Sequence, residues 1–294
     1  MPHVLKNKNL EIHFDLPNEN YNFSRFDWTG KIVEVKFQGL SLSSLECTDG
    51  ENENHFGKGF YNEFGIDAAL GFDEAEIGGW FHKIGVGLLK KDSPKYLFSK
   101  PYEIQAAQFK SIVEFDRISI TCKSDTVNGY SYILEKTIEL QESSFTIKYQ
   151  LQNTGKKDIT TTEYVHNFTA INKALISKDY LLKFPFRIKP ERFGETVNPE
   201  QKVDIQPKEI MFNGTPKEPF FFSNLTGSEM VDAAWELSNR KHNIGISETG
   251  SFQTNKVNLW GWTHVISPEL FFDIFIKPGQ SRSWARRYEL FRLK

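Results

Sequence analysis

Strict alternation of apolar and polar residues is the feature that most restricts the fold of this chain. In SFTIKYQL, at 144–151, phenylalanine, isoleucine, tyrosine and leucine occupy every second position, with polar residues between them. A period of two places these apolar side chains on one face of an extended strand, and a helix cannot use it. RISITCK at 117–123 alternates in the same way. The pattern predicts β-strands that each bury one face.

Similar extended runs recur along the chain, separated by Asn, Gly, Pro and Asp residues that favour turns. They are IVEVKF at 32–37, YSYILEKTIEL at 130–140, VDAAWELS at 231–238, LFFDIFIK at 270–277 and SWARRYELF at 283–291. Windows with helical spacing between helix caps are scarce. About a dozen strands fit, at the spacing of β-sandwiches. No Pro-rich or Ser-rich linker divides the chain, so we expect one all-β, antiparallel domain over 1–294.

Turn sequences agree with this fold class. SDTVNGY at 124–130 carries Asn-Gly and QNTGKKD at 152–158 carries Asn-Thr-Gly, residues that supply the positive φ of tight β-connections. The segment 50–85 is different, because it combines Gly, Asn and acidic residues with seven aromatic residues. Long loops of this kind often border a functional site. We expect a loop beside a cleft, and a surface insertion packed by its own side chains is the alternative.

Composition excludes several classes of function. The net charge is −2, without a basic stripe, so nucleic acid is not an expected partner. Cys47 and Cys122 are too few for a disulfide framework and are expected to be reduced. The N-terminus lacks the pattern of a secretory signal, and no window approaches the roughly 20 apolar residues of a membrane span. These features predict a cytoplasmic protein without membrane contact.

No common cofactor motif is present in the sequence. HExxH, an EF-hand loop, a phosphate-binding glycine loop and the GxSxG nucleophile elbow are all missing. We therefore expect neither a metal nor another cofactor. The chemistry that remains is general acid–base catalysis by His, Glu and Asp side chains that the fold would have to bring together.

The first candidate for such chemistry is EYVHNF at 163–168. Alternation puts Tyr164, His166 and Phe168 on one face of a strand, with Glu163 and Asn167 on the other. A histidine at the end of a strand is more often structural than catalytic. The segment predicts a strand, and if the face with His166 lines a cleft, Glu163 and Asn167 turn away from it and support it.

Two further segments combine histidine with aromatic residues. His82 and Lys83 follow two aromatic residues at the end of the 50–85 segment. Trp260, Trp262 and His264 lie in NLWGWTH at 258–264, where indole rings could stack on the apolar face of a sugar. Core tryptophans and a solvated loop histidine are equally good interpretations.

Together with the central His–Asn pair, the last strand pair suggests a family. It is joined by IKPGQS and ends in WARRYEL at 284–290. Over essentially its whole length, the chain resembles the galactose mutarotase-like superfamily, and most of all the divergent aldose 1-epimerase-like proteins of bacteria. The resemblance implies a β-supersandwich that binds a sugar and interconverts its anomers without metal or nucleotide. The implied ligand is a monosaccharide or an oligosaccharide.

The resemblance also implies roles for individual residues. His166 matches the histidine that protonates the ring oxygen, with Asn167 beside it and Tyr164 on the same face. His82 corresponds to a histidine that binds sugar hydroxyls, and Arg25 is a further polar contact. In the family, a late glutamate takes the proton from the anomeric hydroxyl.

The catalytic glutamate is where this sequence departs from the family. Aligning Leu259 with the leucine of the family's Leu-Glu motif puts Trp260 at the position of the carboxylate, and an indole cannot accept the proton. Glu269 and Glu248 are the nearest replacements in the sequence. The alternatives are that the alignment slips at this point, or that the protein binds a sugar without epimerising it.

Three functional alternatives follow from the resemblance. The first is a non-catalytic carbohydrate-binding protein on the same fold. The second is a hexose-6-phosphate 1-epimerase, which would need a cluster of cations such as Arg25, Lys83, Arg286 and Arg287. The third, a relative of polysaccharide lyases, fits less well because those proteins usually carry additional domains. The sequence leaves the oligomeric state open.

Overall fold

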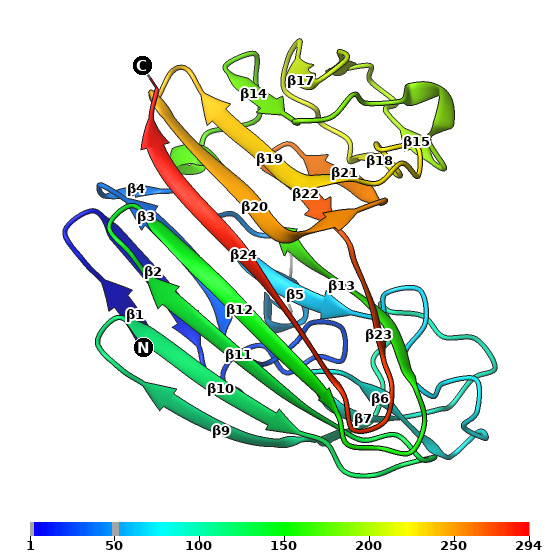
Figure 1. Ribbon diagram of the computed structural model, residues 1–294. Helices are drawn as coiled ribbons and strands as arrows, with labels where there is room; N and C mark the ends of the chain where they lie inside the picture. Colours follow the sequence, from blue (N-terminus) through cyan, green and yellow to red (C-terminus); the bar gives the residue numbers. More distant parts are fainter. Residues whose placement is uncertain (1–2, 49–52, 294) are drawn as a thin grey trace.

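Two large antiparallel sheets face each other across the core of the protein (Figure 1). The computed structural model describes residues 3–48 and 53–293. The first sheet has seven strands, in the order β1 (His3–Lys6), β2 (Leu10–Asp15), β3 (Lys31–Phe37), β5 (Phe60–Phe64), β13 (Ile159–Asn167) and β23 (Phe272–Ile276), with β4 (Leu40–Ser41) beside β3. The second sheet has ten strands, in the order β16 (Val203–Ile205), β17 (Glu209–Phe212), β14 (Tyr180–Lys183), β19 (Val231–Asn239), β20 (Ile244–Thr254), β24 (Ser281–Arg292), β12 (Ser144–Asn153), β11 (Tyr132–Leu140), β10 (Arg117–Lys123) and β9 (Gln108–Val113).

Two small sheets flank this sandwich. One has the order β15 (Thr196–Val197), β18 (Phe220–Phe222), β21 (Val257–Trp262) and β22 (Val265–Leu270). The other contains β6 (Trp80–Lys83), β7 (Gly87–Lys90) and β8 (Ile104–Ala106). The helices of the described residues are single 3₁₀ turns, η1 (Glu53–His55), η2 (Ile171–Lys173) and η3 (Pro190–Arg192). The prediction of an all-β, antiparallel fold is confirmed. The number of strands is underestimated, because strands of two to four residues are too short to show a period.

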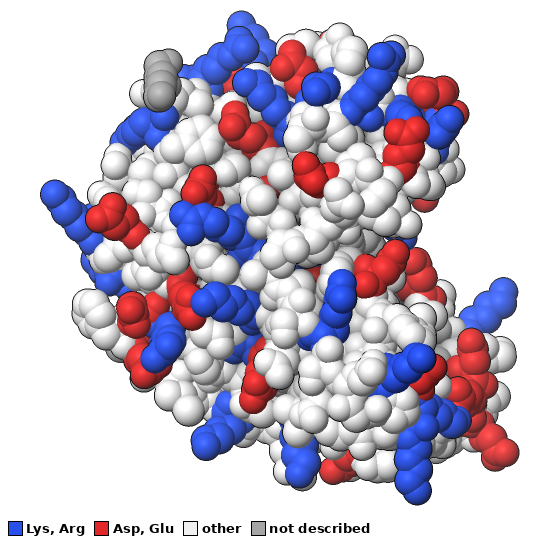
Figure 2. All heavy atoms as spheres, viewed as in Figure 1, with Lys and Arg blue, Asp and Glu red and all other residues white. Residues whose placement is uncertain are grey.

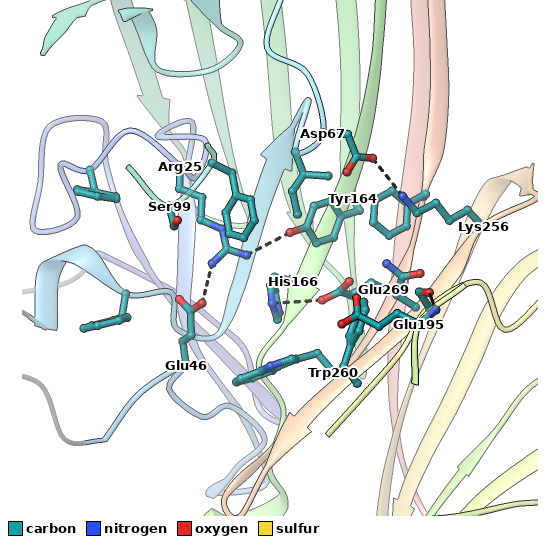
Figure 3. A pocket seen from close by; sticks show the side chains of 18 of the residues that line it. Arg25, Glu46, Asp67, Ser99, Tyr164, His166, Glu195, Lys256, Trp260 and Glu269 are labelled. Carbon is teal, nitrogen blue, oxygen red and sulfur yellow. Dashed lines mark hydrogen bonds and ion pairs between the residues drawn. The ribbon is translucent and has the colours of Figure 1, made fainter. Parts of the chain in front are cut away.

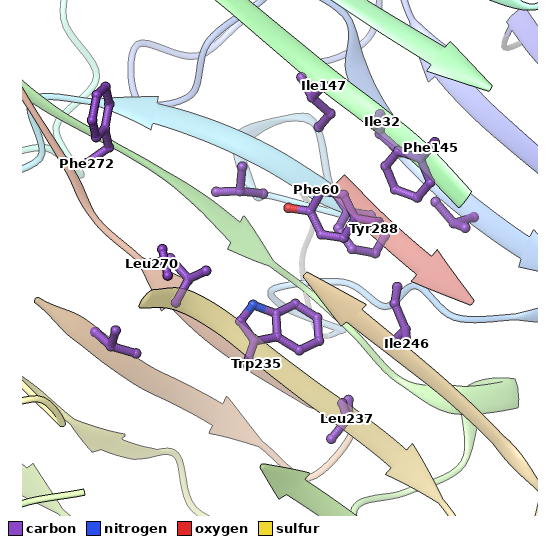
Figure 4. Close-up of a cluster of buried hydrophobic side chains, with 14 of the residues drawn as sticks. Ile32, Phe60, Phe145, Ile147, Trp235, Leu237, Ile246, Leu270, Phe272 and Tyr288 are labelled. Carbon is purple, nitrogen blue, oxygen red and sulfur yellow. The ribbon is translucent and has the colours of Figure 1, made fainter. Parts of the chain in front are cut away.

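Aromatic and aliphatic side chains from both large sheets form the core between them (Figure 4). The ring of Phe60 in β5 lies 5.9 Å from that of Phe145 in β12 and 5.1 Å from that of Tyr288 in β24. Trp235 of β19 extends the same cluster. Burial of this apolar surface is the main favourable term in folding.

The alternation read from the sequence is present in β12. Its phenylalanine, isoleucine, tyrosine and leucine are all buried, whereas Lys148 and Gln150 are exposed. The turn at 124–130 joins the paired strands β10 and β11, with φ of 53° at Asn128 and 86° at Gly129. The turn at 152–158 instead joins β12 to β13, which belong to different sheets. The second turn is therefore a crossover between the layers.

The prediction of one long loop over 50–85 is wrong in part, and its first residues, 50–52, lie outside the described residues. Phe60–Phe64 forms β5, which is buried along its length between β3 and β13, and Trp80–Lys83 forms β6. Asn62 and Glu63 made β5 look too polar for a core strand. Both side chains have buried partners, since Asn62 hydrogen-bonds to Tyr149 and Glu63 pairs with Lys83 at 3.1 Å. Pairing of this kind offsets the cost of burying polar groups.

The surface carries both signs of charge. Figure 2 shows Lys and Arg interspersed with Asp and Glu over the visible face, in agreement with the net charge of −2. Over residues 3–48 and 53–293, the structure contains no helix with the length and apolar character that a membrane crossing requires.

Candidate functional site

A cleft of about 960 Å³ lies beside the end of β13, against the small sheet β15-β18-β21-β22 (Figure 3). Polar and charged side chains share its lining with aromatic ones. The aromatic lining includes Phe23, Phe56, Phe98, Phe221, Trp260 and Phe271. This mixture of apolar walls and a few converging polar groups is typical of small-molecule sites.

His166 and Glu269 meet inside this cleft. His166 Nε2 lies 3.2 Å from Glu269 Oε1, and His166 Nδ1 shares a 2.6 Å hydrogen bond with the hydroxyl of Ser267. Just beyond β13, Thr169 pairs with Ile266 of β22 and brings the two strands together. Because side chains alternate along β22, Ser267 and Glu269 share the face that points at the histidine.

Burial shifts the protonation of both groups. Removal from water raises the pKa of Glu269 to about 8, although the nearby Arg25 acts in the opposite direction. Burial lowers the pKa of His166 well below its usual 6.5, and the positive charge of Arg25 lowers it further. Both shifts favour uncharged forms, because a low dielectric penalises the ionised state. The pair that burial favours is therefore a neutral imidazole beside a protonated carboxyl.

Arg25 anchors a second group of polar side chains in the cleft wall. Its Nε donates to Glu63 at 2.9 Å and its Nη1 to Glu46 at 2.6 Å. The Tyr164 hydroxyl donates to the same Glu63 at 2.7 Å, and Lys83 approaches Glu63 from behind at 3.1 Å. Arg25 is thus held by two carboxylates, and Figure 3 shows it pointing toward Glu46 and Tyr164.

Aromatic rings fix the orientation of the histidine. The ring of Phe168 stacks on His166 with centroids 4.0 Å apart, and the Trp260 indole meets the imidazole edge-on at 5.4 Å. Phe271 stacks on Tyr164 at 4.6 Å. These contacts hold the imidazole and leave its Nε2 directed at Glu269.

A buried polar network holds the backbone on both sides of Glu269. Asn167 Nδ2 donates to the carbonyl of Pro268 at 2.6 Å and to the carboxylate of Glu248 at 3.0 Å. Arg286 donates to the carbonyl of Leu270 at 2.8 Å and to Glu248 at 2.6 Å. The residues before and after Glu269 are therefore tied to one network inside the sandwich.

Five of the predicted site residues line the cleft together. They are Arg25, Tyr164, His166, Trp260 and Glu269. The structure therefore places a carboxylate beside His166 although Trp260 occupies the position that the alignment gave to the glutamate.

Three predicted residues lie behind the cleft. Asn167 and Glu248 face the interior, because alternation along β13 turns Asn167 away from His166. Glu248 is fully buried and pairs with Arg286 rather than facing the cleft. Lys83 is also buried, on Glu63.

The other predicted residues lie elsewhere. His82 is buried edge-on against Tyr132, with ring centroids 5.8 Å apart. The Trp262 indole donates to the carbonyl of Lys217 at 2.7 Å, which ties it to a neighbouring loop. His264 Nε2 lies 3.0 Å from the carbonyl of Leu45. None of these three predicted residues is part of the cleft lining.

The sequence does not point to three residues of the site, Glu46 in the cleft lining and the buried Glu63 and Ser267 behind it. Glu63 and Glu46 lie in segments without a visible period, and their role depends on contacts with Arg25. Ser267 could have been found, because it shares with Glu269 a face of the run VISPEL. Over the described part of the chain, no group of three or more His, Cys, Asp or Glu side chains is arranged to hold a metal ion.

Comparison with solved structures identifies the fold. The galactose mutarotase-related enzyme of Lactobacillus acidophilus superposes with a TM-score of 0.60 at 10% identity, covering 100% of both chains. A galactose mutarotase-like protein of Lactobacillus casei gives 0.59 at 11%, covering 99% of this chain and 100% of the other. The GalM/aldose epimerase homologue of C. elegans gives 0.57 at 12%, covering 100% of both. The chain therefore has the galactose mutarotase-like fold.

Comparisons at the level of sequence give no match. No family model matches the chain. No curated protein matches it either. The similarity to these proteins is therefore one of fold.

Proposed function

We propose that the cleft binds a neutral aldose and interconverts its anomers by acid–base opening of the ring. The observation that carries this proposal is the contact between His166 Nε2 and Glu269 Oε1 at 3.2 Å, in the wall of a cleft with aromatic faces. The proteins that share the fold include one described as a galactose mutarotase-related enzyme and one described as an aldose epimerase homologue.

Two groups this close suit the chemistry of ring opening. The anomeric hydroxyl and the ring oxygen are both bonded to C1, so one donor and one acceptor side by side can reach both. The acceptor takes the proton of the anomeric hydroxyl while the donor protonates the ring oxygen. The bond between C1 and the ring oxygen breaks and C1 becomes a carbonyl. After rotation about the bond between C1 and C2, the reverse transfers close the ring as the other anomer.

The pair needs one transferable proton, and either member can hold it. With the proton on His166, imidazolium protonates the ring oxygen and the Glu269 carboxylate accepts, as the family resemblance implies. Burial favours the proton on Glu269, and the carboxyl is then the donor and His166 Nε2 the acceptor. In both arrangements, each member of the pair returns to its starting protonation state after one ring opening and one ring closure.

A neutral sugar fits the charges of the cleft better than a sugar phosphate. Its two cationic side chains among the described residues already have partners, Arg25 with two carboxylates and Lys256 with Asp67 at 3.2 Å. The other cations considered for a phosphate site do not line the cleft. Lys83 is buried against Glu63 at 3.1 Å. Arg286 is in the core, and Arg287 is exposed beside Glu289. A phosphoryl group that binds Arg25 or Lys256 would have to displace a carboxylate from that side chain.

In this proposal, Asn167 and Glu248 are positioning residues. Asn167 donates to the carbonyl of Pro268 and to Glu248, and Glu248 accepts from Arg286, which donates to the carbonyl of Leu270. Asn167 and Glu248 therefore act through the backbone around Glu269 and not on the sugar. A displacement of about 1 Å in a catalytic group can cost roughly 100-fold in rate. The buried network is therefore expected to matter for turnover more than for sugar affinity.

Polarimetry tests the proposal and its substrate class. The optical rotation of freshly dissolved α-D-glucose and α-D-galactose should reach equilibrium faster with the protein. The protein should accelerate the equilibration of their 6-phosphates less. Faster equilibration of the phosphates would reject the neutral-sugar assignment. Failure to accelerate any aldose, together with quenching of tryptophan fluorescence on sugar addition, would support the non-catalytic binding alternative.

A further inference from the structure

The small sheet beside the catalytic pair carries an aromatic row that leads away from it. Register pairs Ser267 of β22 with Trp260 of β21, Trp260 with Phe221 of β18, and Phe221 with Val197 of β15. Directly paired residues of antiparallel strands project from the same face of a sheet. The row therefore begins at the hydroxyl that bonds His166 and continues along the cleft face through Trp260 to Phe221.

A polar row runs beside the aromatic one. Glu269 of β22 pairs with Asn258 of β21, and the Asn258 side-chain oxygen accepts from the backbone nitrogen of Asn224 at 3.0 Å. Ser223, directly after β18, and Glu195, directly before β15, continue the polar lining, and the Glu195 backbone nitrogen donates to the Ser223 hydroxyl at 2.6 Å. Alternation along β21 places Asn258 on the same face as Trp260. The cleft floor thus offers apolar ring faces next to hydrogen-bonding groups over three successive strands.

The dimensions of this floor exceed one sugar ring. Neighbouring strands are about 4.8 Å apart, which is close to the width of a pyranose. A ring over Trp260 at the catalytic pair therefore leaves the Phe221 position for a second ring. The cleft volume of about 960 Å³ is also near the upper end of the roughly 300–1,000 Å³ of sites for drug-sized ligands, which are larger than a monosaccharide.

We propose that Phe221 forms a second sugar subsite and that the ligand is the reducing end of an oligosaccharide. Its reducing ring lies over Trp260 at His166 and Glu269, and the next ring lies over Phe221 with its hydroxyls toward Ser223 and Glu195. The proposal deepens the aldose epimerase function and rests on it. Anomer exchange needs a free reducing end, and the outer part of the cleft accommodates the rest of the chain.

Calorimetric titration with disaccharides and monosaccharides tests the subsite separately from turnover. Maltose, cellobiose and lactose are compared with glucose and galactose, and at least one disaccharide should bind about tenfold more tightly than its reducing-end monosaccharide. Phe221→Leu should remove most of this preference, whereas Phe221→Tyr, which keeps the ring, should retain it. Phe115→Ala, at an 88% exposed position, is the matched control.

The possible outcomes separate the two proposals. Equal affinity for monosaccharides and disaccharides would contradict the subsite. So would an equal loss of affinity for both kinds of sugar in Phe221→Leu. Phe221-dependent disaccharide binding without anomer exchange would leave the subsite standing and remove the epimerase function. Unchanged thermal unfolding of the Phe221 variants shows that lost binding does not come from lost folding.

Discussion

At the scale of single residues, the site depends on two groups that burial keeps uncharged. His166 and Glu269 are each 4% exposed, and their side chains contact each other. In water, a histidine and a glutamate side by side would be an ion pair at pH 6. In this cleft, desolvation lowers the pKa of the histidine and raises that of the carboxyl. The upper limit of the pH range in which the pair holds one proton therefore rises from about 6.5 to about 8, and its lower limit is the lowered pKa of His166.

The pH dependence of kcat/KM follows from these shifts, because that ratio reports the free enzyme. Above a pH of about 8, Glu269 loses its proton and the pair has no donor, so activity falls. On the acid side, activity is lost only when His166 gains a proton, well below pH 6.5. Polarimetric rates corrected for spontaneous mutarotation give the profile. An optimum confined between 4.5 and 6.5, with loss above 6.5, would show that neither pKa is shifted.

A second residue-scale prediction concerns Asn167, which touches no cleft surface. Asn167→Ala removes the donors to Pro268 and Glu248 and should lower kcat by about 10–100-fold with a smaller change in KM. Gln150→Ala, on an exposed position of β12, is the control. A folded Asn167→Ala protein with unchanged kcat would show that the network does not position Glu269.

At the scale of elements, alternation along β13 places the cleft residues on one face of the strand and the residues of the buried network on the other. Its outward residues Tyr164 and His166 reach the cleft, while its inward residues Glu163 and Asn167 join the buried network. The neighbouring strand β5 combines packing and polar contacts in the same way, since Phe60 fills the core and Glu63 holds Arg25. The strands thus carry the site and the core on opposite faces.

Substitution of Phe60 tests how much β5 contributes to the stability of the fold. Phe60→Ala should reduce the free energy of unfolding by about 3–5 kcal/mol, because it leaves a cavity between the sheets. Phe275→Ala, at a 57% exposed position in β23, should change it by less than about 0.5 kcal/mol. Urea unfolding followed by circular dichroism measures both. A similar loss of unfolding free energy in the two variants would show that Phe60 of β5 contributes no more to stability than an exposed residue.

The same elements show what could be predicted from the sequence. The residue pattern shows the alternating strands and the division of β13 into two faces. It does not show β5, because the polar residues of β5 find their buried partners far away in the chain. The sequence also does not show whether Glu248 or Glu269 is the carboxylate that faces His166. The latter meets His166 only because β22 packs against the end of β13, a contact between residues about a hundred positions apart.

At the scale of the whole molecule, an ion-pair network crosses the sandwich. Arg286 of β24, in the ten-stranded sheet, donates to Glu163 of β13, in the seven-stranded sheet, at 2.7 Å. It also pairs with Glu248 of β20. All three side chains are fully buried. The network therefore couples the relative placement of the sheets to the strand that carries His166.

Removing the cation of this network should be costly. Arg286→Met would leave Glu163 and Glu248 buried without their partner and reduce the free energy of unfolding by about 3–5 kcal/mol. Arg287→Met, at the next and exposed position, should be nearly neutral. Urea titration of both variants gives the difference. A loss below about 1 kcal/mol in Arg286→Met would show that the network does not stabilise the sandwich.

Magnetisation transfer between the anomeric protons of glucose or galactose at equilibrium tests the catalytic pair most directly. It measures exchange between the α and β forms without any net reaction. The wild-type protein should accelerate this exchange, and His166→Gln and Glu269→Gln should each lower the rate by about 100-fold or more while the fold is kept. Exchange that is unaffected by both substitutions would contradict the assignment of this pair.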